Sequence, residues 1–434
     1  MQLLNYTLGD ILEKWAFETP VSEFIVYPDR NLQFTYKQFN ERVDQLAKGL
    51  IYIGIQPKDK VGVWANNIPD WTTLMFATAK IGAILVTINT NYKLVELEYL
   101  LKNSDINTLF MVDGYRDSDY VKMVTELVPE LKSHARGTLK SKRFPKLKNV
   151  AVIGQQKHRG MYSTAELILL GSHIDDIELE SAKISLSCHD VTMMIYTSGT
   201  TGFPKGVMLS HHNILNNGYS VGECMKYSAN ERLLVCVPLF HSFGNVLGIC
   251  AIVTHGATLV FTEDYEPLMV FAAIQKEKCT AIYGVPTMFI DELNHPMFDM
   301  FDLNSLRTGI MAGDVCPIET VKSVMTKMHV KDLIIVYGLT ETSPGMTATR
   351  AHNSAETRAT TVGFELPNVE VKIVNTKNGE LCGVEEQGEI CCRGYNIMKG
   401  YYNDPKATQN VIDSEGWLHS GDLAVKSEDG FYRI

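Results

Sequence analysis

Apolar and polar positions predict helices and strands in turn along most of the chain. Apolar residues recur at helical spacing in residues 39–50, and a short apolar run follows at 60–65. The same pairing recurs at residues 71–88, 94–112, 270–284 and 318–336. Short runs that are apolar throughout are typical of strands buried on both faces by helices. We therefore predict an α/β fold with doubly wound, mainly parallel sheets.

The pattern changes after about residue 350. Residues 369–374 alternate strictly between apolar and polar, residues 388–393 alternate more loosely, and Gly and Asn turns lie between them. Such alternation is typical of antiparallel strands with one face exposed. We expect a boundary there, with residues 1–350 forming the α/β part and residues 351–434 a smaller β-rich unit.

Composition narrows the class of protein. The chain has 434 residues, of which 45% are hydrophobic and 21% are charged, as expected of a large globular enzyme with more than one lobe. Its net charge of −10 argues against general nucleic-acid binding, which requires excess Lys and Arg. The exception is the basic stretch 132–148, which we interpret as a solvated loop, with contact to an anionic partner such as CoA phosphates as the alternative.

Cysteines and apolar stretches bear on location. The nine cysteines lack metal-binding spacing and indicate reduced thiols in a cytoplasmic protein. The N-terminus has no secretory signal pattern, and apolar stretches such as residues 246–253 are far shorter than the roughly 20 residues that span a bilayer. We expect no transmembrane segment, while peripheral membrane contact and the oligomeric state stay open.

The stretch at residues 196–206 is rich in groups that bind phosphate. It reads Tyr-Thr-Ser-Gly-Thr-Thr-Gly-Phe-Pro-Lys-Gly and follows the apolar run 191–196. Glycine lets backbone N–H groups approach an anion, and hydroxyls and a lysine add contacts. No Ser or Thr follows the lysine, which argues against a P-loop. The predicted pyrophosphate contacts are Thr197, Ser198, Gly199, Thr200, Thr201, Gly202 and Lys205.

Further polar segments follow predicted strands. Residues 337–342 read Tyr-Gly-Leu-Thr-Glu-Thr and come directly after the apolar run 333–336, at the strand end where open α/β sheets bind ligands. Residues 388–405 contain Gly-Glu-Ile-Cys-Cys-Arg-Gly, and residues 416–422 read Gly-Trp-Leu-His-Ser-Gly-Asp. Taken alone, Glu341 would be interpreted as a solvated carboxylate.

These segments, in this order, resemble the adenylate-forming (AMP-binding) superfamily, which contains acyl-CoA synthetases, luciferases and peptide-synthetase adenylation domains. The resemblance covers essentially the whole chain as the large N-terminal domain. It implies two doubly wound, mainly parallel sheets with flanking helices, a smaller β-barrel-like subdomain, and an active site at their junction. The family continues beyond the position of Ile434 through a hinge into a mobile C-terminal domain, so we expect that domain to be absent here.

The resemblance also implies residue roles. Tyr337 would lie against adenine, Thr340 would meet the α-phosphate, Glu341 would hold Mg²⁺, and Asp422 would bind the ribose. Gly338 is expected to belong to the same nucleotide-binding run. Ser420 stands where the family usually has threonine and keeps the hydroxyl.

Two weaker matches complete the set. Residues 311–317 resemble the turn that lines adenine, with Gly313 and Asp314 in it, although the family more often has a second small residue where Asp314 stands. Residues 237–244 resemble the segment that carries a histidine near the acyl carboxylate, here His241. By itself His241 fits a hydrogen-bonded core histidine equally well.

The implied activity is ATP-dependent activation of a carboxylic acid as acyl-AMP, with Mg²⁺, release of pyrophosphate and transfer to CoA. Residues 237–244 and 285–289 look most like those of medium- or long-chain fatty acyl-CoA synthetases, and no early aspartate for a substrate amine is found there. The alternatives are an aryl or amino acid as substrate, and a catalytically silent nucleotide-binding module.

Overall fold

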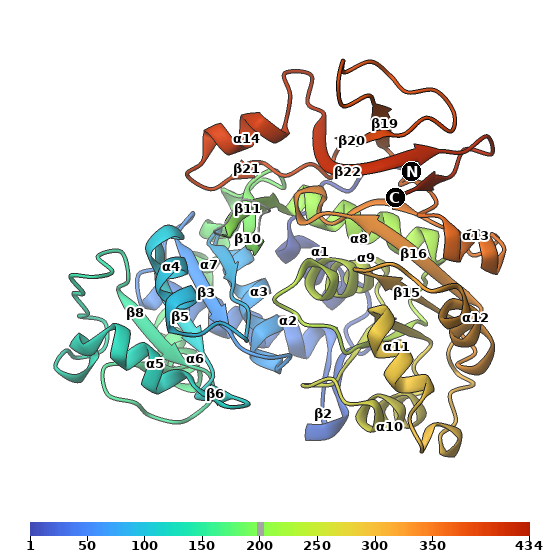
Figure 1. Ribbon diagram of the computed structural model, residues 1–434. Helices are drawn as coiled ribbons and strands as arrows, with labels where there is room; N and C mark the ends of the chain where they lie inside the picture. The colour runs from blue at the N-terminus through green and yellow to red at the C-terminus, as the bar shows by residue number, and fades with distance from the viewer. Residues whose placement is uncertain (198–203) are drawn as a thin grey trace.

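Two large sheets flanked by helices and a smaller sheet make up the molecule (Figure 1). The computed structural model describes residues 1–197 and 204–434. The chain begins and ends close together, beside the smaller sheet (Figure 1). Among the described residues, no helix has the length and apolar character needed to cross a membrane.

The first large sheet has nine strands. Its central neighbours run parallel, and the pairs at its two edges are antiparallel. In spatial order the strands are β18 (Phe364–Glu365), β17 (Gly345–Ala348), β16 (Asp332–Gly338), β15 (Thr308–Ala312), β14 (Ala281–Gly284), β12 (Arg232–Val235), β13 (Thr258–Phe261), β1 (Glu23–Tyr27) and β2 (Leu32–Thr35).

The second large sheet has eight strands, and all but the two pairs at one edge are parallel. In order they are β21 (Gly400–Tyr401), β11 (Lys205–Ser210), β10 (Val191–Thr197), β4 (Ile84–Thr87), β3 (Lys60–Trp64), β5 (Ile106–Met111), β8 (Asn149–Val152) and β9 (Tyr162–Ser163). A separate short hairpin joins β6 (Gly114–Tyr115) to β7 (Ser118–Asp119).

The smaller sheet is antiparallel and contains, in order, β19 (Val369–Val374), β20 (Gly388–Gly394), β22 (Leu418–Lys426) and β23 (Tyr432–Arg433). The helices are α1 (Leu8–Glu18), α2 (Tyr36–Tyr52), α3 (Pro69–Lys80), α4 (Leu94–Asn103), α5 (Tyr120–Leu127), α6 (Thr164–Leu170), α7 (Asp176–Ile184), α8 (His211–Cys224), α9 (Ala251–His255), α10 (Pro267–Glu277), α11 (Pro286–Leu293), α12 (Ile318–Lys327), α13 (Ala355–Thr360) and α14 (Pro405–Val411).

This architecture confirms the predicted fold class of two mainly parallel sheets with a smaller β unit. The expected helix at residues 39–50 belongs to α2, and the expected strand at residues 281–284 is β14. Strand β18 lies beyond residue 350 and pairs with β17 of the first sheet. The division into residues 1–350 and 351–434 stays a prediction.

Strand burial explains why the parallel strands are apolar throughout. Val63 of β3 packs in the largest core, whereas the next residue, Trp64, packs in a second core under α4 and α5. Successive side chains of a strand point to opposite faces, so a strand covered on both faces needs apolar residues at every position.

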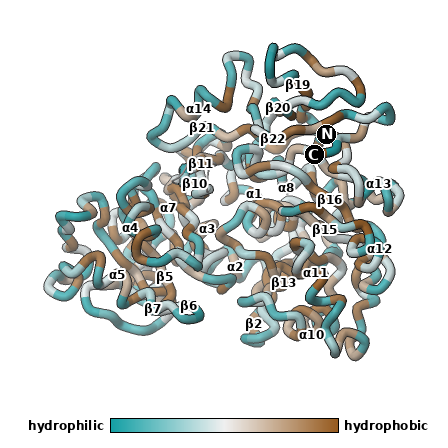
Figure 2. The backbone as a smooth tube through the Cα atoms, viewed as in Figure 1, coloured by the Kyte–Doolittle hydropathy of each residue, from teal (hydrophilic) through white to brown (hydrophobic). Residues whose placement is uncertain are grey.

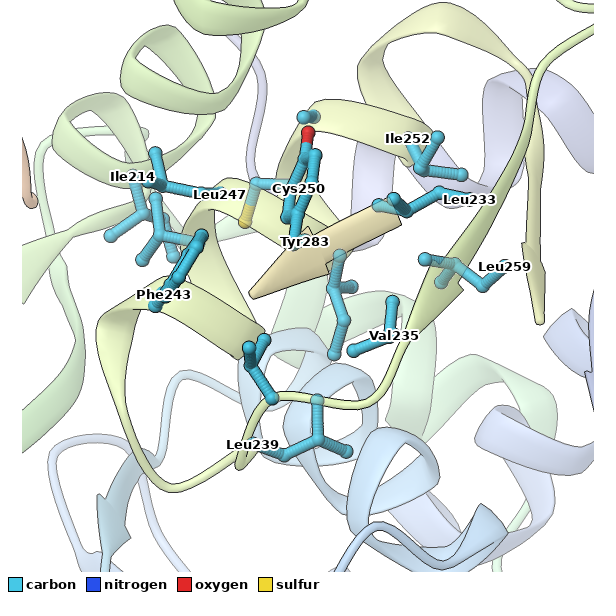
Figure 3. Packing of buried hydrophobic residues seen from close by; sticks show 14 of the residues in the cluster. Ile214, Leu233, Val235, Leu239, Phe243, Leu247, Cys250, Ile252, Leu259 and Tyr283 are labelled. Atoms are coloured by element: carbon cyan, nitrogen blue, oxygen red, sulfur yellow. The ribbon is translucent and has the colours of Figure 1, made fainter. Parts of the chain in front are cut away.

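The largest core is shared by both big sheets. It contains Val61 of β3 and Leu233 of β12, together with side chains of α1, α2, α3, α8 and α9. Figure 2 shows hydrophobic positions concentrated along the inner elements. In Figure 3, Leu233, Leu259 and Tyr283 of three adjacent strands pack against side chains such as Cys250 of the helical segment above them. The two sheets therefore cannot separate without exposing this core.

The smaller sheet is attached to α8 through the segment that follows β20. The Asn213 amide donates to the carbonyl oxygen of Ile397 at 3.0 Å, and the Tyr395 hydroxyl donates to Ser220 Oγ at 2.7 Å. Further along, β21 pairs with β11 of the second large sheet. These bonds position β20 and β22 beside the ends of β10 and β16.

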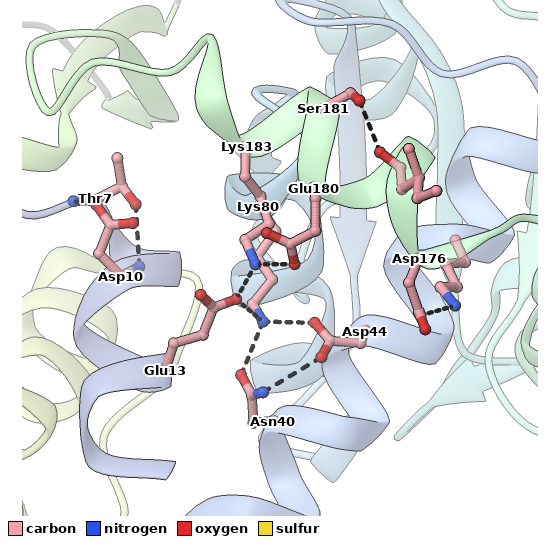
Figure 4. Close-up of polar contacts among 12 residues, drawn as sticks. Thr7, Asp10, Glu13, Asn40, Asp44, Lys80, Asp176, Glu180, Ser181 and Lys183 are labelled. Carbon is pink, nitrogen blue, oxygen red and sulfur yellow. Dashed lines mark hydrogen bonds and ion pairs between the residues drawn. The ribbon is translucent and has the colours of Figure 1, made fainter. Parts of the chain in front are cut away.

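A buried lysine joins the helices that cover the second sheet (Figure 4). The side chain of Lys80 is 0% exposed, and its Nζ donates to Glu13 at 2.6 Å, to Asp44 at 2.5 Å and to Asn40 at 2.8 Å. Burial acts to raise the pKa of both carboxyl groups. The pKa of Asp44 is raised, whereas the ammonium groups of Lys80 and Lys183 outweigh burial at Glu13 and lower its pKa. The lysine links α1, α2 and α3.

We expect Lys80→Met to lower the free energy of unfolding by about 3 kcal/mol, because the partly buried Asp44 loses its counter-charge and Glu13 keeps only Lys183. Urea unfolding followed by circular dichroism measures this change. The control is Lys322→Met, whose exposed pair with Glu319 should contribute less than about 0.5 kcal/mol. Equal effects of the two substitutions would show that the Lys80 cluster is not a structural link.

Candidate active site

A cleft of about 850 Å³ lies where the carboxyl ends of strands from both large sheets meet the smaller sheet. Its walls include Thr87 at the end of β4, Thr197 at the end of β10 and Gly338 at the end of β16. Strand β22 contributes Asp422 to the wall. The carboxyl end of a parallel sheet is where α/β proteins bind their ligands, because strand ends and loops converge there.

Thr197 and Lys205 mark the side predicted to bind phosphate. They face each other across the antiparallel pair of β10 and β11, and both line the cleft. The Lys205 ammonium lies 5.0 Å from the centre of the Tyr401 ring and pairs with no carboxylate of the described residues. The predicted contacts Ser198, Gly199, Thr200, Thr201 and Gly202 lie outside the described residues.

The structure brings Tyr337 and Asp422 together, although 85 residues separate them. The Tyr337 hydroxyl donates to Asp422 Oδ2 at 2.7 Å. Burial and the neighbouring carboxylate raise the pKa of Tyr337, so the phenol stays protonated and holds Asp422 in the cleft wall. The Asp422 N–H in turn donates to Ser420 Oγ at 3.0 Å.

Gly338, Thr340 and Glu341 follow the end of β16 and line the same cleft. A Cβ on Gly338 would lie 1.9 Å from the carbonyl oxygen of Pro344, so only glycine fits there. Glu341 accepts a hydrogen bond from the Tyr401 hydroxyl at 2.7 Å on Oε1. Its Oε2 makes no hydrogen bond within the described part of the chain and is free to bind a cation.

His241 lies exposed on the cleft wall, just before the π-helical segment Phe243–Cys250. Desolvation by the surrounding walls lowers the pKa of His241, so the ring is uncharged at neutral pH. The Phe243 N–H donates to His241 Nδ1 at 3.1 Å, which places the ring proton on Nε2 as a donor.

The turn after β15 brings one predicted residue to the cleft and leaves the next outside it. Gly313, with φ of 89°, adopts the left-handed conformation that glycine tolerates, and it lines the cleft. The neighbouring Asp314 is exposed and accepts the N–H of Val315 at 2.7 Å. Its side chain therefore stabilises the turn and does not line the cavity.

A second cavity of about 440 Å³ adjoins the cleft. Both cavities are lined by Phe240, His241 and Gly313. The lining of the second cavity is mainly apolar and includes Cys236, Val237, Pro238, Phe243, Val285 and Met288. A ligand that extends from the cleft past His241 into this cavity would contact these apolar side chains.

Two carboxylates that line this cavity were missed by the sequence analysis. Glu263 and Asp264 line it, but Glu263 pairs with Arg30 and Asp264 accepts a hydrogen bond from the Tyr115 hydroxyl. Neither stands in the segment where an amine-pairing aspartate was sought, and isolated acidic residues carry no signal of such a position.

Glu292 is a further group that the sequence did not reveal. It is 1% exposed, its Oε2 has no hydrogen-bond partner among the described residues, and its charge would raise the pKa values of Cys236 and Tyr265 of the cavity wall. Burial raises the pKa of Glu292 to about 8, with a smaller contribution from Asp291. At neutral pH Glu292 is therefore mostly a neutral carboxylic acid.

Comparison with known proteins identifies the class. The AMP-binding enzyme family matches residues 12–402, and the chain belongs to this family. Its curated relatives include acyl-CoA synthetases and acyl-CoA ligases.

Among relatives, the YngI protein of Bacillus subtilis (strain 168) is 48% identical over 433 residues, covering 100% of this chain and 79% of YngI. The mitochondrial medium-chain acyl-CoA ligase ACSF2 of Homo sapiens is 35% identical over 440 residues, covering 100% of this chain and 71% of the ligase. The inhibitor-bound N-terminal domain of FACL13 from Mycobacterium tuberculosis has a TM-score of 0.84 at 22% identity, over 99% of this chain and 98% of that domain, which shows a shared fold.

The buried Glu292 carboxyl predicts a pH dependence of stability. Because its pKa rises from 4.5 in the unfolded chain to about 8 in the fold, its contribution is fully present below pH 4.5 and is lost as pH rises towards 8. We expect Glu292→Gln to match the wild type at about pH 5 and to exceed it by roughly 4 kcal/mol at about pH 9. Urea unfolding at both pH values tests this. As a control, Asp291→Asn changes an exposed neighbour and should leave most of the pH dependence of stability in place. If Glu292→Gln shows the same pH profile as the wild type, Glu292 is not the source of that dependence.

Proposed function

We propose that this protein joins a medium-chain carboxylic acid to the α-phosphate of ATP and transfers the acyl group to CoA. One observation carries the proposal: a polar cleft with Lys205, Glu341 and Asp422 adjoins a mainly apolar cavity, and His241 lines both. The cleft suits a nucleotide and the cavity suits an acyl chain, so their junction is where the two reactants would meet.

The nucleotide would lie along the cleft between β22 and β11. Asp422, oriented by the Tyr337 hydroxyl, would accept hydrogen bonds from the ribose hydroxyls. Thr197 and Lys205 lie on the opposite strand pair and would contact the phosphates, together with the predicted loop at residues 198–202. The uncompensated Lys205 ammonium favours an anion at that end.

Glu341 is the residue that would hold Mg²⁺. A hard cation binds oxygen ligands, and Glu341 offers a carboxylate oxygen on the cleft wall that no described residue occupies. When bound, the ion would neutralise phosphate charge. The Tyr401 hydroxyl orients the same carboxylate from its other oxygen.

The proposed reaction takes place in two steps. A carboxylate oxygen attacks the α-phosphorus, the bond to the bridging oxygen breaks, and pyrophosphate leaves. The CoA sulfur, which loses its proton, then attacks the acyl carbon and AMP leaves. His241 Nε2–H is placed to donate to the carboxylate, and Lys205 and Thr340 stabilise charge on the phosphoryl oxygens.

The cavity favours a medium-length aliphatic acid. Its lining is mainly apolar but also includes Arg116, Glu263 and Asp264, whose charges a long alkyl chain would desolvate at a cost. The name of the ACSF2 relatives agrees with this length. Because Glu263 and Asp264 already have partners, an amino acid is disfavoured. A cytoplasmic location stays a prediction.

A series of acyl-sulfamoyl adenosines tests the acid. Affinity should rise roughly fourfold for each added methylene until the cavity is full, because each buried methylene contributes about 0.8 kcal/mol. Isothermal titration calorimetry on the chain measures it, with benzoyl and aminoacyl analogues as the competing classes. Equal binding of adenosine sulfamate and every acyl analogue would instead support a silent nucleotide-binding module.

Glu341→Gln tests the cation. The substitution keeps shape but removes the charge, so the affinity for ATP in the presence of Mg²⁺ should fall by about tenfold, or 1.4 kcal/mol. Affinity for ATP in EDTA should change little and serves as the control. Unchanged affinity for Mg-ATP would remove Glu341 from the metal site.

A further inference from the structure

Three side chains with different donor atoms converge where β20 pairs with β22. Cys391 is opposite His419 in the register, and Glu389 stands two residues before Cys391 on β20. Residues two apart on a strand share a face, and the pairing is irregular between Glu389 and Cys391. Both side chains are thereby directed towards the His419 ring.

The distances between these atoms suit a single ion. His419 Nδ1 lies 2.9 Å from Glu389 Oε2 and 3.4 Å from Cys391 Sγ, and the three donor atoms lie within 4.8 Å of one another. Around tetrahedral zinc, ligand atoms are about 3.3–3.7 Å apart, given bonds of about 2.0–2.3 Å. A movement of several tenths of an ångström by Glu389 would open the space.

The carboxylate of Asp413 lies beside the cluster and orients the His419 ring. His419 Nε2 lies 3.6 Å from Asp413 Oδ2, while Asp413 Oδ1 accepts N–H groups of Glu415 and Trp417 at 2.9 Å each. A histidine that ligates a metal through one nitrogen usually presents its other N–H to such a carboxylate. This arrangement leaves Nδ1 for the ion.

The donor set selects the cation. Thiolate and imidazole favour zinc, whereas Mg²⁺ requires oxygen ligands such as Glu341 offers elsewhere in the cleft. Cys391 is fully buried against Val374 and Trp417, but Glu389 and His419 line the cleft. An ion bound by all three would therefore keep an open coordination position towards the cleft. Burial raises the pKa of the Cys391 thiol to about 12, so binding must also displace a proton from sulfur.

We propose that Glu389, Cys391 and His419 bind one Zn²⁺ ion and that this ion weakens nucleotide binding in the adjacent cleft. Strand β22 carries both His419 and Asp422, and Glu389 Oε1 accepts the Gly421 N–H at 2.9 Å. Coordination would redirect Glu389 and His419, and so alter the turn that presents Asp422. The effect on nucleotide binding rests on the proposed nucleotide site, whereas zinc binding itself does not.

Direct zinc binding is tested on the whole chain after treatment with EDTA and its removal. Competition with a chromophoric chelator should give one zinc per chain with a Kd at or below about 1 µM. Cys391→Ser and His419→Gln should each weaken binding at least about tenfold. The matched control is Cys392→Ser, because the neighbouring thiol faces the opposite side of β20, towards Asn396.

X-ray absorption spectroscopy of the wild type tests the zinc ligands even if a variant folds poorly. X-ray absorption of the zinc-loaded wild type should show one sulfur ligand together with nitrogen and oxygen ligands. A Cys391→Ser variant that is folded by circular dichroism and binds zinc like the wild type would overturn the site, as would an absorption spectrum without sulfur. Saturating Mg²⁺ should not compete.

The effect of zinc on nucleotide binding is measured with a fluorescent ATP analogue, with and without one equivalent of zinc. Affinity should fall at least about tenfold in the wild type and in Cys392→Ser, and should not change in Cys391→Ser. If the zinc-loaded wild type binds the ATP analogue with unchanged affinity, zinc does not regulate nucleotide binding, whereas the zinc site itself would still stand. Failure to bind the analogue without zinc would instead count against the proposed nucleotide site.

Discussion

The structure depends on one apolar core that belongs to both large sheets. Val61 of the second sheet and Leu233 of the first pack in the same cluster, with helices α1, α2, α3, α8 and α9 between them. Because hydrophobic burial is lost if the sheets separate, this core holds their carboxyl strand ends in a fixed relation. The cleft exists because Thr197 and Gly338, each at the end of a strand in a different sheet, face the same space.

Two lysines show how the protein treats charge differently in core and cleft. Lys80 is enclosed by Glu13, Asp44 and Asn40, so its charge is compensated within the fold. The Lys205 ammonium lies over the Tyr401 ring, pairs with no carboxylate among the described residues, and lines the cleft. A buried charge has to be paired for stability, whereas a charge left without a counter-ion at the cleft attracts an anionic ligand.

The smaller sheet completes the cleft from the other side. Asp422 comes from β22 and is held by Tyr337 of β16, while Tyr401 of β21 holds Glu341. Asp422 and Glu341 are thus each oriented by a phenol from another segment. Tyr401 stands in a segment that the sequence marked, but no local pattern indicated that its hydroxyl would orient Glu341.

The sequence by itself determined the order of elements, because period 3.6 and continuous apolar runs report burial locally, as in α2 and β14. It also marked Thr197 and Lys205, because a segment rich in glycine and hydroxyls follows an apolar run, whereas Glu341 and Asp422 were marked by the resemblance to the adenylate-forming superfamily. Only the tertiary structure decided which of these meet. It brought Tyr337 to Asp422, kept Asp314 out of the cleft, and gathered Glu389, Cys391 and His419. Such contacts depend on strand register and sheet packing between residues far apart in the chain, and no local pattern of side chains encodes them.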